Sequence, residues 1–336
     1  MKEALLYTKL EDNQLRCDLC AHRCLIQEGK RGICGVRENR GGVLYSLVYG
    51  KAIATHVDPI EKKPLFNFLP GLLSFSVATV GCNMTCLHCQ NADISQAPRE
   101  TGRIMGEQIT PEELVEAALQ GGCRSIAYTY TEPTIFFEYA LDTARLAKTR
   151  GVKNIFVTNG YMTEEALEMI NPVLDAANVD LKSFRDDFYR DVCGARLQPV
   201  LETIKRMHGQ GIWLEVTTLI IPGHNDSDEE LEAIGRFLSG ISPDIPWHVS
   251  AFYPTYLLTS APPTPAVTLR RARKIGQAAG LRYVYTGNIP GDDGENTYCP
   301  NCGKIIIERT GYRVGAVNIR DGNCAFCSTP VAGVWS

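Results

Sequence analysis

The sequence lacks the long apolar runs and the strong excess of one charge that mark several protein classes. No stretch approaches the roughly 18 consecutive apolar residues of a membrane-spanning helix, and the start mixes charges through its short apolar stretch, unlike a secretory signal peptide. Lysine and arginine number 34 against 38 aspartates and glutamates, a net charge of −4, which disfavours an extensive nucleic-acid surface. We therefore expect a cytoplasmic protein without a membrane partner, for which nucleic acid is a poor candidate ligand.

Internal repeats, low-complexity tracts and long Gly/Ser linkers are also absent. With 336 residues, 44% hydrophobic and 21% charged, the chain has the composition of a folded globular protein. Its length corresponds to two domains, or to one large domain with small modules attached. We expect an N-terminal Cys-rich extension (1–70), a core (71–290) and a small C-terminal module (291–336).

Cysteine is plentiful, and its arrangement is more informative than its number. The chain has 13 cysteines, an odd count, so a complete disulfide framework cannot use them all. Eleven fall into three tight groups, which in a reducing compartment indicate metal binding. The groups are Cys17, Cys20, Cys24 and Cys34; Cys82, Cys86 and Cys89; and Cys299, Cys302, Cys324 and Cys327.

From about residue 73 to residue 287, short β-rich runs alternate with longer helical ones. This pattern predicts an α/β fold with a parallel sheet covered by helices, either a barrel or an open doubly wound sheet. Thr110-Pro111 followed by two glutamates is typical of a helix start. The expected strands are Ser74–Val80, Ser125–Tyr130, Asn154–Thr158, Asn178–Leu181, Trp213–Ile221, His248–Tyr253 and Arg282–Thr286.

Polar residues stand where five of these strands end. The carboxyl ends of parallel strands form the active-site face of β/α folds, so these residues are candidates for one site. Any single one of them could equally be an ordinary loop-entry residue. The five positions are Gly81-Cys82, Thr131-Glu132, Asn159-Gly160, Asp180 with Lys182, and Thr217-Thr218.

The central cysteines follow the first expected strand directly. Cys82, Cys86 and Cys89 place three thiols within eight residues, with no fourth cysteine nearby. Three thiolates can hold three irons of a [4Fe–4S] cluster and leave the fourth iron open for chemistry. The alternatives are a zinc site completed by His88 or a distant cysteine, and a loop of free thiols.

The CxxxCxxC spacing of these cysteines matches the motif of the radical S-adenosylmethionine (SAM) superfamily. Within that superfamily the chain resembles the pyruvate formate-lyase activating enzymes, and more closely the radical SAM member of the AmmeMemoRadiSam system. The resemblance covers nearly the whole chain. It is carried by 58–65 (DPIEKKPL), 81–83 (GCN), 90–91 (QN), 128–134 (YTYTEPT), 246–250 (PWHVS) and 333–335 (GVW).

The resemblance implies a partial (β/α)6 barrel and an enzyme that uses a [4Fe–4S] cluster and SAM. In such enzymes the open iron binds the amino and carboxylate groups of SAM, and an electron from the cluster breaks the 5′ carbon–sulfur bond. The resulting 5′-deoxyadenosyl radical takes a hydrogen atom from the substrate. The substrate is not assigned by sequence, and part of a partner protein is one candidate; the electron donor would be a protein such as flavodoxin or ferredoxin.

The resemblance also implies roles for single residues. Thr131 and Glu132 occupy the position of the family's GGE-like stretch, whose two glycines are absent here, and Glu132 would accept a hydrogen bond from the SAM ammonium. Asp180 and Lys182 match a DLK stretch that reaches the ligand or a cation.

Two further positions complete the SAM contacts that the resemblance implies. His248 lies at the position of a histidine near SAM, and Glu215 would touch the ribose. Each assignment has a structural alternative: a helix cap for Glu132, an ion pair for Asp180 with Lys182, and a satisfied core histidine for His248.

The terminal cysteine groups differ in spacing. Cys299-x2-Cys302 and Cys324-x2-Cys327, with 21 residues between the pairs, match a zinc ribbon, and Ile305–Arg309 with Tyr312–Val314 reads as its hairpin. We expect a structural zinc ion there.

The N-terminal group matches no simple pattern. Its four cysteines, with His22 as a fifth candidate ligand, could hold zinc or a fully ligated [4Fe–4S] cluster that relays electrons. Cys123 and Cys193 stand alone and receive no role.

Three functions are compatible with the sequence. The first is a radical SAM enzyme with an unassigned substrate, and the second is a glycyl-radical activase that acts on a partner protein. The third is a non-catalytic, metal-stapled interaction module, against which the intact cysteine triad argues.

Overall fold

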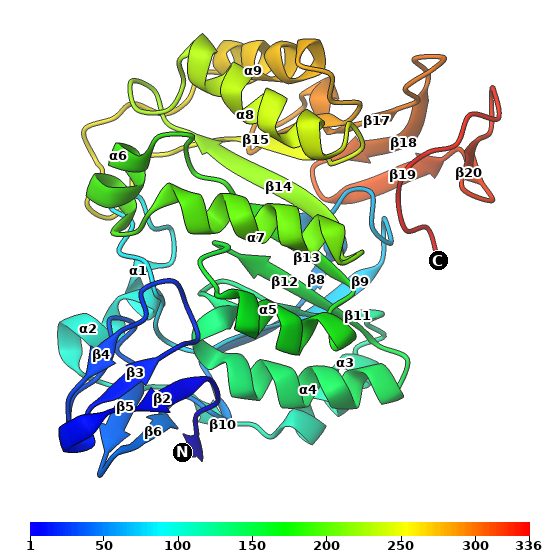
Figure 1. Ribbon diagram of the computed structural model, residues 1–336. Helices are drawn as coiled ribbons and strands as arrows, with labels where there is room; N and C mark the ends of the chain where they lie inside the picture. Colours follow the sequence, from blue (N-terminus) through cyan, green and yellow to red (C-terminus); the bar gives the residue numbers. More distant parts are fainter.

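The computed structural model describes residues 1–336 and shows three parts (Figure 1). A small N-terminal part of short strands lies against one end of a large sheet with its helices. A second small sheet, formed by the last 40 residues, lies at the opposite end. Both termini are therefore held by elements of the fold outside the large sheet.

The large sheet has eight strands in the order β16-β15-β14-β13-β12-β11-β9-β8, and all neighbours are parallel except β8 and β9. All seven predicted strands are present, with ends within two residues of those expected, so the predicted α/β class with a mostly parallel sheet is confirmed. β8 was not predicted. The strands are β8 (Ala54–Pro59), β9 (Leu73–Ala78), β11 (Ser125–Tyr128), β12 (Lys153–Thr158), β13 (Ala176–Asp180), β14 (Trp213–Ile220), β15 (Trp247–Ala251) and β16 (Val284–Gly287).

Nine α-helices connect or precede these strands, and none has both the length and the apolar character needed to cross a membrane. The expected helix start at Thr110 is confirmed: its Oγ1 accepts from Glu113 N (3.2 Å), and the Glu113 carboxylate accepts from Thr110 N (2.7 Å). The helices are α1 (Ala92–Ser95), α2 (Ala97–Thr101), α3 (Pro111–Gln120), α4 (Phe137–Thr149), α5 (Glu164–Ile170), α6 (Asp186–Phe188), α7 (Leu197–Gly209), α8 (Asp228–Ile241) and α9 (Ala266–Ala278).

The two faces of the sheet are covered by different parts of the chain. Because side chains alternate along a strand, Ile126 and Phe156 join the main core while their neighbours Ala127 and Ile155 point to the other face. There the segment 60–69 packs through Ile60, Leu65, Phe68 and Leu69. The partial-barrel closure and the three domain boundaries stay predictions.

The N-terminal part contains two three-stranded sheets and one strand pair. A buried ion pair between Arg37 and Glu138 (2.9 Å) fixes it to α4, and Glu138 also accepts from Leu5 N (2.7 Å). The sheets are β1 (Lys2–Glu3) with β6 (Val43–Ser46) and β5 (Arg37–Arg40), and β2 (Tyr7–Lys9) with β3 (Leu15–Cys17) and β4 (Leu25–Ile26). The pair is β7 (Lys51–Ala52) with β10 (Glu107–Gln108).

The C-terminal part contains β17 (Thr297–Tyr298), β18 (Ile305–Thr310) and β19 (Arg313–Val317), followed by the pair β20 (Ile319–Arg320) and β21 (Asn323–Cys324). β18 and β19 form the predicted hairpin. The chain end returns to the segment between β8 and β9, where Val334 N donates to Asn67 O (2.8 Å) and Val334 O accepts from Leu69 N (2.7 Å). The C-terminal part is thus attached to the segment 60–69.

Candidate active site

The loop that carries the central cysteines begins at the carboxyl end of β9. Gly81 has φ +101°, and a Cβ at this position would lie 2.7 Å from Val36 Cγ1, so the loop requires glycine. Arg99 of α2 fixes the backbone of this loop, because its guanidinium donates to the carbonyl oxygens of Cys82 (2.5 Å) and Met84 (2.9 Å). Arg99 was not among the predicted site residues, because no local pattern distinguishes it from other helix arginines.

The three thiols of this loop lie in a shared, mostly buried setting. Cys82 accepts from Met84 N (3.4 Å) and from Asn159 Nδ2 (3.8 Å), and Cys89 Sγ lies 3.2 Å from Ser95 Oγ. Burial, together with the nearby Glu132 carboxylate, raises the pKa of Cys82, and burial raises the pKa of Cys89. Buried thiolates therefore need the positive charge of a metal.

The three sulfur atoms do not all lie within 4.8 Å of one another. Thiolates on one tetrahedral zinc ion would stand about 3.8 Å apart, given a Zn–S bond of about 2.3 Å. A [4Fe–4S] cluster gives each cysteine its own iron and so keeps the sulfurs further apart. The donor set fits a cluster better than a single ion.

Cys86 has two further neighbours that could bind metal. Its sulfur, the Cys193 sulfur and a ring nitrogen of His88 lie within 4.8 Å of one another, and all three residues are buried. Contact with Cys193 and burial raise the pKa of Cys86, and burial lowers the pKa of His88 to about 3, which leaves its imidazole neutral. His88 Nδ1 is buried without a hydrogen-bond partner.

The stretch 130–132 lies beside the cysteine loop. Tyr130 has φ +62°, a left-handed conformation that costs a non-glycine residue about 1–2 kcal/mol. Its carbonyl accepts from Asn91 Nδ2 (2.8 Å), and Thr131 Oγ1 donates to Thr79 O (2.8 Å). The backbone thus adopts a glycine-like conformation at Tyr130, although the glycines expected from the resemblance are absent.

Glu132 is buried and its carboxylate accepts four hydrogen bonds from the protein. Oε1 accepts from the backbone N (3.0 Å) and Oγ1 (2.6 Å) of Thr134 and from Thr158 Oγ1 (2.7 Å), and Oε2 accepts from Asn159 N (2.8 Å). Glu132 therefore caps the short helix Pro133–Phe136. Its contact with the SAM ammonium stays a prediction.

Asp180 and Lys182, at the end of β13, form an ion pair with 2.9 Å between Oδ2 and Nζ. Burial alone would lower the pKa of Lys182. The negative charges of Asp180, Cys86 and Cys193 outweigh this effect and raise it. Lys182 consequently carries a fixed positive charge beside the cysteine loop. The Asp180–Lys182 ion pair, which the sequence analysis named as the alternative to ligand binding, is therefore present. Contact of either residue with a ligand stays a prediction.

His248 and Glu215 form a second buried pair, in which His248 Nε2–H donates to Glu215 Oε2 (2.6 Å). Glu215 also accepts from Phe66 N, Asn67 N and Trp213 Nε1 (3.0, 2.8 and 3.0 Å). Both of its oxygens are therefore occupied, and a ribose contact would require it to give up one of these donors. Glu215 orients His248 and holds the segment 60–69.

His248 faces a polar cavity of about 720 Å³. The cavity reaches from Gln90, next to the last cysteine of the loop, to Glu61 and Phe66 of the segment 60–69. Its outer wall is the β18–β19 turn, Thr310 to Tyr312. This size and the placed polar groups suit a small-molecule ligand.

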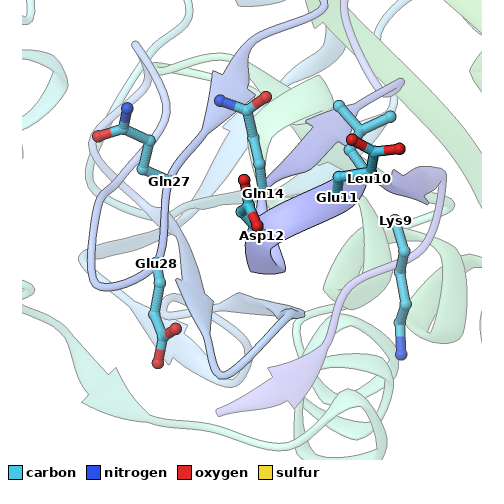
Figure 2. A pocket seen from close by; sticks show the side chains of 7 residues that line it. All are labelled: Lys9, Leu10, Glu11, Asp12, Gln14, Gln27 and Glu28. Carbon is cyan, nitrogen blue, oxygen red and sulfur yellow. The ribbon is translucent and has the colours of Figure 1, made fainter.

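A larger hollow lies on the N-terminal part (Figure 2). Its lining side chains are mainly exposed and point in different directions rather than converging on a common centre. They are Lys9, Leu10, Glu11, Asp12, Gln14, Gln27 and Glu28. This hollow has none of the groups that mark the site at the sheet.

The two terminal cysteine groups differ in geometry. The four C-terminal sulfurs lie within 4.8 Å of one another, with 3.6 Å between Cys299 and Cys327 and 3.8 Å between Cys302 and Cys324. These distances fit one tetrahedral zinc ion.

The N-terminal cysteines line one small cavity together with His22. No three of their sulfurs lie within the same 4.8 Å limit. The sulfurs of the two terminal groups are therefore arranged differently.

A family profile and several relatives match the chain. The profile of the radical SAM superfamily matches residues 76–238. An uncharacterized protein of Methanocaldococcus jannaschii is 47% identical over 334 residues, which is 98% of this chain and 99% of the relative. Pyruvate formate-lyase 1-activating enzyme of Escherichia coli is 23% identical over 167 residues, which is 47% of this chain and 65% of that enzyme.

Solved structures share the fold. A radical SAM methyltransferase from Sphaerobacter thermophilus superposes with a TM-score of 0.52 at 16% identity, over 65% of this chain and 67% of that one. SuiB of Streptococcus suis, solved with its precursor peptide SuiA, gives a TM-score of 0.51 at 15% identity, over 69% of this chain and 52% of that one.

Proposed function

Because the chain belongs to the radical SAM superfamily, and thus uses a [4Fe–4S] cluster and SAM, we propose that it is an enzyme that cleaves SAM reductively and abstracts a hydrogen atom from its substrate. When bound, the cluster supplies the electron that breaks the 5′ carbon–sulfur bond of SAM. The chain's own residues bind, orient and shield the reactants. The resemblance to the radical SAM member of the AmmeMemoRadiSam system stays part of this proposal.

The observation that carries the proposal is the position of Cys82, Cys86 and Cys89. Their loop starts at the carboxyl end of β9 and lies beside Glu132 and Lys182, which follow two other strands of the sheet. One buried thiol and two partly buried ones beside a fixed positive charge fit a cluster with one open iron. The loop itself carries no fourth cysteine, although Cys193 Sγ lies within 4.8 Å of Cys86 Sγ. In this proposal the three loop cysteines hold three irons, and SAM takes the open position on the fourth.

The cavity next to the loop provides the space for the adenosyl group and the substrate. Gln90, which follows the last cysteine of the loop, lines this cavity together with His248 and Glu61. The β18–β19 turn shields it from one side, which limits the access of water to a reactive radical.

The experiment is anaerobic reconstitution with iron and sulfide, followed by SAM, a strong reductant and quantification of 5′-deoxyadenosine. The control is the variant Cys82→Ala/Cys86→Ala/Cys89→Ala. Formation of 5′-deoxyadenosine that disappears in the control supports the proposal. If no cluster assembles on the wild-type loop, the proposal is wrong and the interaction-module function takes its place.

A second candidate is the activation of a glycyl-radical protein. It is favoured by the similarity to pyruvate formate-lyase 1-activating enzyme, a similarity that covers 47% of this chain. A stable organic radical on a candidate partner, detected by electron paramagnetic resonance after incubation with SAM, would support it.

A further inference from the structure

The four N-terminal cysteines surround a cavity that the proposed reaction does not use. Cys17, Cys20 and Cys34 are buried and Cys24 is partly exposed, so the cavity lies near the surface. Apolar side chains such as Leu19, Ile26 and Ile135 complete most of its wall. A space enclosed by four thiols in an apolar shell is a metal site rather than a packing defect.

The spacing of the sulfurs differs between the two terminal cysteine groups. No three of the four N-terminal sulfurs lie within 4.8 Å of one another, whereas all four C-terminal sulfurs do. A single zinc ion holds its thiolates about 3.8 Å apart, so the C-terminal group fits zinc. The N-terminal sulfurs are not gathered in this way, as expected for a cluster whose four irons each take one cysteine.

A fixed positive charge lies beside these thiols. Arg37 lines the cavity, is 1% exposed and is held by Glu138 at 2.9 Å. A buried guanidinium in the wall of this cavity, near Cys17 and Cys34, stabilises the negative charge that a cysteine-ligated cluster carries.

The N-terminal loop and the central cysteine loop touch directly. His22 Nε2–H donates to the carbonyl of Asn83, the residue after Cys82 (2.7 Å). Arg99 donates to the carbonyl of Ile33, the residue before Cys34, and to that of Cys82, both at 2.5 Å. One direct hydrogen bond and the bridging side chain of Arg99 therefore hold the two cysteine loops side by side, as electron transfer between them requires.

We propose that Cys17, Cys20, Cys24 and Cys34 hold a second [4Fe–4S] cluster that passes electrons to the cluster at Cys82, Cys86 and Cys89. This rests on the proposed function, which supplies the acceptor. A fully ligated cluster has no open iron for SAM, so its chemistry is electron transfer. A reduced flavodoxin-class or ferredoxin-class donor loses one electron, which moves through the N-terminal cluster to the central one, and no bond or proton is exchanged.

The first test counts metals in the full-length chain after anaerobic reconstitution. The wild type should hold about eight irons, eight sulfides and one zinc ion, and the Cys82→Ala/Cys86→Ala/Cys89→Ala variant about four irons and four sulfides. This variant leaves the N-terminal group intact, so the result does not depend on how well N-terminal variants fold. Cys123→Ala, a buried cysteine outside all groups, is the matched control and should keep about eight irons.

The second test separates the two clusters by their response to SAM. The dithionite-reduced triple variant should show a paramagnetic resonance signal that SAM does not change. The Cys20→Ser/Cys34→Ser variant should keep about four irons and show a signal that SAM does change. Electron transfer is then tested in that variant: 5′-deoxyadenosine formation should fall roughly tenfold with reduced flavodoxin and stay near the wild-type rate with dithionite.

Different failures have different meanings. A triple variant that holds no iron but about two zinc ions makes the N-terminal group a zinc site and overturns this inference, while the proposed function stands. If the Cys20→Ser/Cys34→Ser variant forms 5′-deoxyadenosine at the wild-type rate with reduced flavodoxin as well as with dithionite, the relay is overturned. If the wild type and the triple variant both hold only about four irons, the central loop binds no cluster. In that case the proposed function is wrong.

Discussion

Arg309 of β18 and Glu61 form a fully buried ion pair, with 3.5 Å between Arg309 Nε and Glu61 Oε1. Arg309 also donates to Phe66 O (2.6 Å) and lies 4.4 Å above the Phe66 ring, and Glu61 accepts from Gly71 N (3.0 Å). The C-terminal part is therefore fixed to the segment 60–69, which in turn supports Glu215 and His248.

Replacing Arg309 by alanine should lower the free energy of unfolding by about 3–5 kcal/mol, because Glu61 would stay buried without its counter-charge. Urea unfolding of the zinc-loaded chain measures this. Arg313→Ala, on the exposed side of β19, is the control and should change stability by less than about 0.5 kcal/mol. Equal effects of the two substitutions would show that the pair contributes nothing.

Asp58 gives the fold a pH-dependent contribution to stability. Although burial opposes it, hydrogen bonds from Lys62, Lys63 and Tyr130 hold the pKa of Asp58 well below its ordinary value of 3.8. A carboxyl group with a depressed folded-state pKa stabilises the protein above its unfolded pKa, and this stabilisation is lost as the pH falls below that value.

Asp58→Asn should therefore be less stable than the wild type at pH 7, and the difference should shrink between pH 4 and more acid conditions. Unfolding in urea at several pH values checks this. Glu168→Gln, an exposed carboxylate on α5, should show no such trend. A constant difference at every pH would contradict the assignment.

The cap formed by Glu132 can be separated from a role in SAM binding. Glu132→Gln replaces an oxygen that accepts hydrogen bonds with an NH₂ group, which faces donors from Thr134, Thr158 or Asn159. We expect a loss of about 1–3 kcal/mol in stability, measured by thermal unfolding without SAM. An unchanged melting temperature combined with weaker SAM binding would instead make Glu132 a ligand contact only.

The sequence was sufficient for the parallel strands and for the cysteine groups, because both depend on local patterns. The parallel strands are short, largely apolar runs that are buried on both faces, and metal-binding spacing is visible in a single stretch of chain. β8 was not predicted because Ala54–Pro59 is not an apolar run and contains His56, Asp58 and Pro59. Its strand conformation depends on pairing with β9.

The contacts that build the site could not be predicted in the same way. His22 meets Asn83 across 61 positions, and Arg37 meets Glu138 across 101. Tyr130 adopts a left-handed backbone that its side chain does not favour, and only tertiary contacts such as its hydrogen bond to Asp58 impose it. These features belong to packing between distant segments, about which a local pattern carries no information.

Removing the C-terminal metal should loosen one wall of the cavity without affecting iron. Cys302→Ala removes one of the four sulfurs that lie within 4.8 Å of one another, so the variant should lose its zinc, retain its iron and unfold at a lower temperature than the wild type. Elemental analysis and thermal unfolding of the reconstituted chain measure these effects. Loss of iron along with zinc would show that the C-terminal group takes part in cluster binding.

His248 is the side chain through which the cavity should recognise SAM. Because Nε2–H donates to Glu215, Nδ1 is left as a hydrogen-bond acceptor, and it has no partner in the protein. His248→Phe keeps a ring of similar size but removes this acceptor, so SAM affinity should fall roughly tenfold while iron content stays the same. Anaerobic equilibrium dialysis with SAM measures this, and His208→Phe, on the exposed side of α7, is the control. If both variants bind SAM as tightly as the wild type does, His248 supports the wall of the cavity and does not contact SAM.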